Sequence, residues 1–120
     1  MAFDWGQYLN LAKFLNGEKV SYWPEAALRS AVSRAYFATY CHARNYASVK
    51  LGFVPTRKAD DHDLLIQHYF NSGRPEIANA LDTLRKWRNQ CDYQDRASIN
   101  IPSTVPFALN RSGKVFADLV

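Results

Sequence analysis

One short segment of the chain concentrates side chains that can bind an anion. Residues 85–93 place Arg88 four positions before Asp92, and Asn89 four positions before Tyr93. Residues four apart lie on the same side of a helix, so each pair shares a face. A permanently charged guanidinium beside an amide and a phenol can hold a phosphodiester and stabilise its pentavalent transition state. The candidate catalytic residues are therefore Arg88, Asn89, Asp92 and Tyr93.

A purely structural interpretation of the same segment stays open. Arg88 and Asp92 can form a salt bridge at the end of a helix, with Tyr93 as an aromatic plug beside it. Helix pairs of this kind are common and contribute only about 0.3–0.5 kcal/mol. The spacing alone does not choose between this arrangement and an anion site.

Basic residues near this segment are candidate contacts to nucleic acid. Arg85 and Lys86 belong to the segment itself, and Arg34 lies on a long predicted helix, where plain solvent exposure is the alternative. Residues 24–58 carry six basic side chains and one acidic side chain, whereas residues 59–76 carry one basic and four acidic side chains. The long helix is thus the basic element of a chain of net charge +4, a surplus that permits a polyanionic partner without requiring one.

The histidines offer weaker evidence of chemistry. His42 stands alone on the long helix, where it can serve as a general base or simply as a half-buried polar residue. The run Asp-Asp-His-Asp at 60–63, followed by His68, looks like a metal cluster. However, His62 and His68 are six positions apart and share no helical face, and no HExxH spacing is present. The acidic run suits the positive N-terminal end of a helix instead, so we expect no metal site.

Several well-known catalytic motifs are absent from the sequence. Neither phosphate loop, GxxxxGK[ST] nor GxGxxG, occurs, and there is no GxSxG. Their absence argues against an NTPase, a kinase, a dinucleotide-binding enzyme and a serine hydrolase, and we expect no cofactor. Cys41 and Cys91 are too few for a disulfide scaffold or for a zinc site built from thiols alone.

Helices must position these side chains, and the spacing of apolar residues is helical throughout. Glycine and proline divide the chain into five segments, each with apolar residues at intervals of three and four. The pattern predicts helices over residues 4–16, 24–50, 61–71, 75–93, and from Ser103 or Thr104 toward residue 120. The predicted fold class is therefore all-α, an up-and-down bundle of about five helices in one domain spanning residues 1–120.

Composition and the first residues indicate where the protein works. The chain has 120 residues, of which 48% are hydrophobic and 22% are charged, as in ordinary globular proteins. No apolar run approaches the roughly 20 residues needed to cross a bilayer. Asp4 stands where a signal peptide needs positive charge. We therefore expect a cytoplasmic protein that does not associate with membranes and whose thiols are reduced.

Two features of the composition predict a homodimer. Small residues recur along the long helix and would allow another helix to approach closely; they are Ala26, Ala27, Ser30, Ala31, Ser33, Ala35 and Ala38. Aromatic residues make up 14% of the chain, which is high for one small core. We expect some of these rings to be buried against a second copy of the chain.

Two stretches together resemble a known family. Residues 26–40, AALRSAVSRAYFATY, are similar to the long helix of HEPN domains, and residues 84–93 resemble the helix that carries the HEPN signature of an arginine, a polar residue and a following histidine. The resemblance implies an all-α bundle that dimerises, in which the Arg and His of two subunits meet in a cleft and cut RNA without a metal. Arg88 takes the place of the signature arginine and Asn89 that of the polar residue, whereas Tyr93 stands where the histidine is expected.

Three functions follow as hypotheses. The first, implied by the resemblance, is a dimer that binds RNA or a nucleotide in the cleft between its subunits, or cuts RNA without a metal as part of a toxin–antitoxin or defence system. The second is a non-catalytic interaction module that partners a nucleotidyltransferase antitoxin. In HEPN toxins of such pairs a tyrosine near the signature accepts a nucleotide, which makes Tyr93 a candidate acceptor. The third is a plain helical structural domain.

Overall fold

Five helices make up the fold, and the prediction of an all-α bundle is confirmed. The computed structural model describes residues 3–16 and 22–120, and no strand occurs within them. In chain order the helices are α1 (Gly6–Leu15), α2 (Pro24–Lys50), α3 (Asp61–Asn71), α4 (Pro75–Tyr93) and α5 (Ile101–Asp118). The bounds of α2, α3 and α4 agree with those predicted, and α1 is shorter by a residue or two at each end.

Proline and glycine set the bounds that the sequence predicts best. Pro24 and Pro75 each occupy the first turn of a helix, where the missing N–H has no partner to lose. Gly52 and Gly73 follow the ends of α2 and α3 with φ of 71° and 74°, a left-handed conformation that glycine adopts without penalty. These residues explain why the long helix stops and the chain turns back.

The start of α5 differs from the prediction. The helix begins at Ile101 rather than at Ser103 or Thr104. Asn100 is the N-cap, because its side-chain oxygen accepts a hydrogen bond from the Ser103 N–H at 3.0 Å. Pro102 therefore lies inside the first turn, which tolerates proline, and does not precede the helix as a break.

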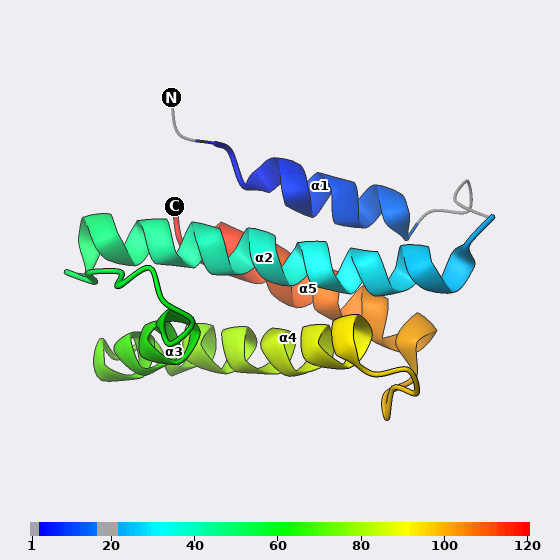
Figure 1. Cartoon of the computed structure of the whole chain (residues 1–120). Helices are drawn as coiled ribbons and strands as arrows, with labels where there is room; N and C mark the ends of the chain where they lie inside the picture. The colour runs from blue at the N-terminus through cyan, green and yellow to red at the C-terminus, as the bar shows by residue number, and fades with distance from the viewer. Residues whose placement is uncertain (1–2, 17–21) are drawn as a thin grey trace.

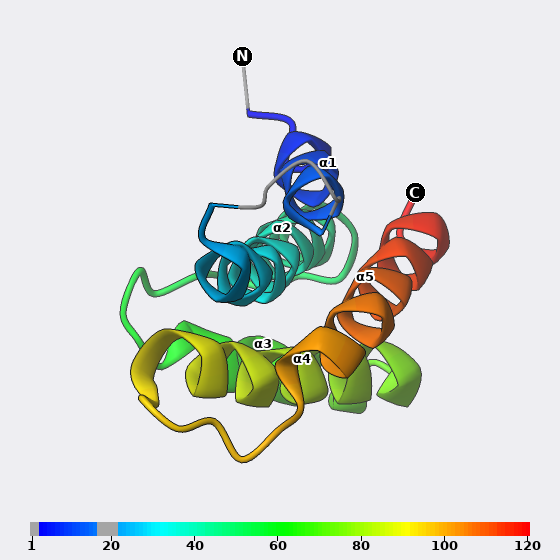
Figure 2. The same cartoon turned by 90° about the vertical axis from the view of Figure 1, so that its right-hand side faces the viewer.

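The long helix α2 lies at the centre of the bundle (Figures 1 and 2). Helix α1 runs antiparallel to α2 along one side of it, and α4 runs antiparallel to α2 along the opposite side. Helix α5 packs against both α2 and α4. Figure 1 views the short α3 nearly along its axis, so that α3 lies across α4 beside the C-terminal half of α2. None of the helices in the described residues is long and apolar enough to span a membrane.

Four of the seven small residues of α2 are buried within the chain itself: Ala27, Ala31, Ala35 and Ala38, the last three completely. Ala26 and Ser30, near the start of the helix, are exposed. At this level α5 comes close enough for the Ser112 hydroxyl to donate to the Ala35 carbonyl oxygen at 3.2 Å. The small-residue face thus lets the chain's own helices approach α2, and it does not by itself call for a second subunit.

Two contacts fix α3 against α2. The buried Tyr69 hydroxyl donates to the Ala43 carbonyl oxygen at 2.6 Å. The neighbouring residue, His68, has its Nε2 2.7 Å from the carbonyl oxygen of Leu51, the C-cap of α2. These bonds hold the last turn of α3 against the C-terminal part of α2.

Candidate functional site

The guanidinium of Arg88 is enclosed by aromatic rings. Arg88 lies on α4, and only 8% of its surface is exposed. Its Cζ lies 5.0 Å from the ring centre of Tyr36 and 5.1 Å from that of Phe37, both on α2. The electron-rich faces of such rings attract a cation, most strongly where water is excluded. Arg88 is therefore held in the α2–α4 interface and does not reach freely into solvent.

The polar contacts of Arg88 match the structural interpretation of this segment. Its Nη1 donates to the Tyr93 hydroxyl at 3.1 Å and lies 3.8 Å from Oδ2 of Asp92. Oδ2 of Asp92 in turn accepts a hydrogen bond from the Ser33 hydroxyl at 3.0 Å. The buried Nε of Arg88 has no hydrogen-bond partner among the described residues. The arginine, the carboxylate and the phenol thus form one cluster, as the spacing predicts.

Helix α2 also holds the end of α4 that carries Asp92 and Tyr93. Arg29 of α2 donates from Nη1 to the carbonyl oxygens of Cys91 and Gln94, at 2.9 and 2.7 Å. The last carbonyls of a helix lack partners within it and carry a partial negative charge, so a guanidinium there satisfies both needs. This contact fixes where the candidate residues at the end of α4 lie.

His62 lies in the same region, a position that the sequence did not predict. Its imidazole stacks on the Tyr40 ring with centroids 4.1 Å apart and planes inclined by 18°. Its Nδ1 forms a hydrogen bond with the Tyr36 hydroxyl, whose ring lies under the Arg88 guanidinium. The acidic neighbours of His62 indicate only a helix start. No local pattern could have revealed its contacts, because its partners lie on another helix.

The environment of His62 favours the neutral imidazole. The pKa of His62 is lowered, first by burial and then by the positive charges of Arg85 and Arg88. Burial also raises the pKa of the Tyr36 phenol, although the same two arginines act against this shift. At neutral pH the pair is therefore an uncharged imidazole hydrogen-bonded to an uncharged phenol. An uncharged imidazole can accept a proton, as a general base must.

The remaining predicted residues are distributed unevenly around this cluster. Arg85 lies at its edge, paired with Asp63 at the start of α3. Asn89 is exposed, and Lys86 is exposed and paired with Asp82 of its own helix at 2.9 Å. Arg34 lies over the ring of Tyr8 on α1, 5.2 Å from its centre. The structure therefore brings together Arg85, Arg88, Asp92 and Tyr93 with Tyr36, Tyr40 and His62, and places Arg34 against a different helix.

The other residues considered for chemistry have structural partners. Nε2 of His42 lies 2.7 Å from the Leu119 carbonyl oxygen, and its ring stacks on Phe116, so it attaches the end of α5 to α2. The Asp61 carboxylate accepts hydrogen bonds from the loop that precedes α3. Cys41 and Cys91 are both buried and free. In the part of the chain that the structure describes, no three His, Cys, Asp or Glu side chains gather as a metal site would require.

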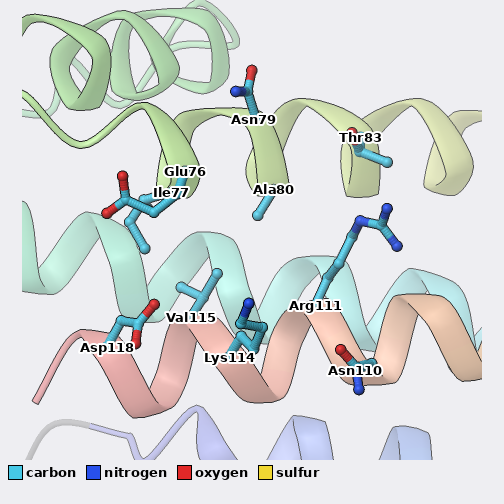
Figure 3. A pocket seen from close by; sticks show the side chains of 10 residues that line it. All are labelled: Glu76, Ile77, Asn79, Ala80, Thr83, Asn110, Arg111, Lys114, Val115 and Asp118. Atoms are coloured by element: carbon cyan, nitrogen blue, oxygen red, sulfur yellow. The ribbon is translucent and has the colours of Figure 1, made fainter.

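A hollow of about 410 Å³ between α4 and α5 lies apart from this cluster (Figure 3). Its walls carry both signs of charge, with Glu76 and Asp118 near one end and Arg111 and Lys114 farther along. The Arg111 guanidinium lies 4.8 Å from the ring centre of Trp87. None of the predicted site residues lines this hollow. Its mixed charge indicates no particular class of ligand.

Fold and cluster together define an all-α protein with a cationic and aromatic site between its second, third and fourth helices. Comparison of the chain with models of protein families, with curated proteins and with solved structures finds no match. The resemblance to HEPN domains stays an expectation from residues 26–40 and 84–93 of the sequence.

Proposed function

We propose that this protein is a HEPN-type dimer that binds RNA, or a nucleotide, at the cluster between α2, α3 and α4. One observation carries the proposal: the His62 imidazole stacks on Tyr40 beside two arginines, Arg85 and Arg88. Guanidinium groups attract phosphates, and flat rings stack on bases. Arg85 is the guanidinium that a phosphate reaches more easily, because its side chain is 26% exposed against 10% for Arg88.

The same cluster can support cleavage of RNA without a metal. The neutral imidazole of His62 takes the proton of a ribose 2′-hydroxyl, and the 2′-oxygen attacks the adjacent phosphorus. An O2′–P bond forms, the P–O5′ bond breaks, and the leaving oxygen takes a proton from solvent. The products are a 2′,3′-cyclic phosphate and a 5′-hydroxyl. The Arg85 guanidinium stabilises the extra negative charge on the phosphorane, and Arg88 fixes the Tyr36 ring, whose hydroxyl holds the His62 imidazole.

Exposed aromatic side chains support the dimer. Since most of the small residues of α2 pack within the chain, the rings carry this part of the proposal. Phe14, Trp23 and Phe107 are 60%, 74% and 61% exposed. Aromatic side chains are enriched in the buried centres of protein interfaces.

The second candidate function is a non-catalytic partner of a nucleotidyltransferase, and two observations favour it. Arg88 already has partners within its own chain, as a structural residue would. Tyr93 is 68% exposed at the end of α4, so its phenol is accessible to a modifying enzyme. In this case the Tyr93 hydroxyl attacks the α-phosphorus of a nucleoside triphosphate bound by the partner: an O–P bond to the nucleotide forms, the bond to the β-phosphate breaks, pyrophosphate leaves, and the phenol proton passes to solvent. The pair then forms a toxin–antitoxin or defence system.

An RNA assay in the presence of EDTA tests the first function. The probe is a fluorescent oligouridylate of about ten nucleotides; anisotropy measures binding, and a denaturing gel measures cleavage. We expect the wild type to bind and cut the probe, Arg85→Gln to bind more weakly, and His62→Gln to bind without cutting. Lys13→Gln, an exposed change on α1, is the matched control and should behave as the wild type.

Three results separate the candidates. No binding of the wild type at low salt contradicts the RNA function. If the wild type and all the variants bind the probe but none cuts it, the proposed ribonuclease activity is wrong and the proposed RNA binding stands. Co-expression with a nucleotidyltransferase that adds a nucleotide mass to the wild type, but not to Tyr93→Phe, supports the second candidate.

A further inference from the structure

A second hollow, more basic than the first, lies beside the cluster. It has a volume of about 540 Å³ and lies between the C-terminal half of α2 and the loop that joins α2 to α3, the green loop at the left of Figure 1. Its lining residues are Tyr40, Arg44, Asn45, Ser48, Pro55, Arg57, Lys58 and Asp61. Three cations and one carboxylate thus line this hollow, and the sequence had suggested none of these cations as a site residue.

The carboxylate in this hollow is already occupied. Asp61 is 4% exposed, and its two oxygens accept hydrogen bonds from the N–H groups of Thr56 and Arg57, at 2.9 and 2.8 Å, and from the Thr56 hydroxyl. These bonds lower the pKa of Asp61, the Thr56 hydroxyl being the largest cause. Asp61 therefore stays ionised. Its oxygens accept hydrogen bonds from the loop and do not pair with the three cations.

The three cations have no acidic partner. Nε and Nη2 of Arg44 donate to the neutral side-chain oxygen of Asn45, at 3.2 and 3.0 Å. Arg57 and Lys58 are exposed. Among the ion pairs of residues 3–16 and 22–120, none includes any of the three. The hollow therefore keeps a net positive charge that its own residues do not neutralise.

The loop that carries two of these cations is held in an uncommon conformation. Arg57 has a φ of 65°, and no other described residue except glycine has a positive φ. A side chain in this region costs about 1–2 kcal/mol. The Arg57 N–H donates to Asp61 before the strained residue, and the Lys58 N–H donates to the Thr56 hydroxyl at 3.2 Å after it, so the backbone is held on both sides of Arg57. A loop fixed in this way holds the backbone that carries both cations beside the hollow before any ligand arrives.

Tyr40 connects this hollow to the cluster. It lines the hollow, and its ring stacks on the His62 imidazole. We propose that the Arg44, Arg57 and Lys58 hollow binds a phosphate group, and that in RNA this is the phosphate next to the nucleotide at His62. The second half of this inference rests on the proposed function, whereas a phosphate from a small molecule would satisfy the first half alone.

Removal of two cations tests the hollow. Arg57→Gln with Lys58→Gln changes two exposed side chains, and Lys13→Gln with Lys114→Gln is the control that removes the same charge elsewhere. Two probes are used: the fluorescent oligouridylate, titrated at several salt concentrations, and inorganic phosphate, followed by shifts of backbone amide signals in NMR spectra. We expect the first double variant to bind RNA about tenfold more weakly, with a salt slope smaller by about 1–2. The control should change both quantities less.

The two probes distinguish a failure of the hollow from a failure of the proposed function. Phosphate-induced shifts at residues 56–58, lost in the Arg57 and Lys58 variant, support the hollow as a phosphate site. If the wild type shows these shifts but binds no RNA, the phosphate site stands, and both the RNA function and the RNA half of the inference are wrong. If RNA binds equally well to both double variants and phosphate shifts no signal near the loop, the hollow is excluded while RNA binding remains.

Discussion

The imidazole of His62 lies face to face with the phenol ring of Tyr40, their centroids 4.1 Å apart. This contact joins two regions that differ in character. On one side, His62 bonds to Tyr36, which lies under the Arg88 guanidinium. On the other, Tyr40 lines a hollow with three cations that form no ion pair among residues 3–16 and 22–120. The stacked pair is thus the point at which a nucleotide and its neighbouring phosphate could be bound together.

The protonation of His62 gives a pH dependence of stability. Because the folded state lowers its pKa, the unfolded chain binds a proton first as the pH falls. Its contribution is fully present above the unfolded value of about 6.5 and is lost as the pH falls from there through the lowered pKa. We expect the free energy of unfolding, measured with urea, to decrease from pH 7.5 to pH 5.5 more in the wild type than in His62→Gln. Equal decreases would show that His62 does not titrate differently in the two states.

Arg88 should matter for stability as well as for function. Arg88→Ala removes a buried side chain from between two rings and leaves Asp92 without its cation, so we expect a loss of about 2–3 kcal/mol in the free energy of unfolding. Arg88→Met keeps most of the packing and should lose less. Urea denaturation of both variants measures the difference. Equal losses would show that the charge, and not the packing, is what stabilises this interface.

The sequence predicted the helices well because their ends are marked locally. Proline lies in the first turn of α2 and α4, and glycine follows the last turn of α2 and α3. The predicted start of α5 was wrong because several residues that can cap a helix lie close together around a proline: Asn100, Ser103 and Thr104. Only the backbone geometry shows which one accepts the hydrogen bond of a capped turn.

The candidate site could be predicted only in part, for a similar reason. The pairs formed by Arg88 with Asp92 and Tyr93 lie within one helix and follow from spacing. The contact of Tyr36 with His62 joins residues 26 positions apart on different helices, and it depends on how α3 docks. The positive φ of Arg57 could not be predicted from the sequence either, because no glycine marks the position and the hydrogen bonds to Asp61 form only in the folded loop. Contacts between helices can be predicted only when the packing of the helices is known, and the spacing of residues within one helix does not give it.

The proposed dimer predicts a mass in solution. One chain weighs 13.7 kDa, and two copies give about 27 kDa. We expect light scattering at micromolar concentration to report the larger value, and Trp23→Ser to shift it toward the smaller one if that exposed ring lies in the interface. A wild-type mass of one chain at this concentration would contradict the dimer without affecting the cluster in each subunit.

Asp61 should hold the loop before α3 through its ionised form. Its pKa is lowered, chiefly by the Thr56 hydroxyl, so its contribution is present above the ordinary carboxylate value of about 4 and is lost as the pH falls through the lowered pKa. Asp61→Asn puts an amide donor against the loop donors, and we expect a lower melting temperature at pH 7. Asp60→Asn, the same change in an exposed neighbour, is the control. A control that lowers the melting temperature as much would show that the general acidity of this turn is what stabilises it.

Arg57→Gly separates the backbone of the loop from its charge. Glycine adopts a φ of 65° without the penalty that a side chain incurs there, and this gain of about 1 kcal/mol opposes the greater freedom of glycine in the unfolded chain. We therefore expect Arg57→Gly to melt at or above the temperature of the wild type, and Arg57→Ala to melt below Arg57→Gly. Both variants lack the guanidinium and should bind the oligouridylate more weakly than the wild type. If Arg57→Gly is clearly less stable than the wild type, the arginine side chain holds the loop itself; if it binds RNA as the wild type does, the charge at this position plays no part in the hollow.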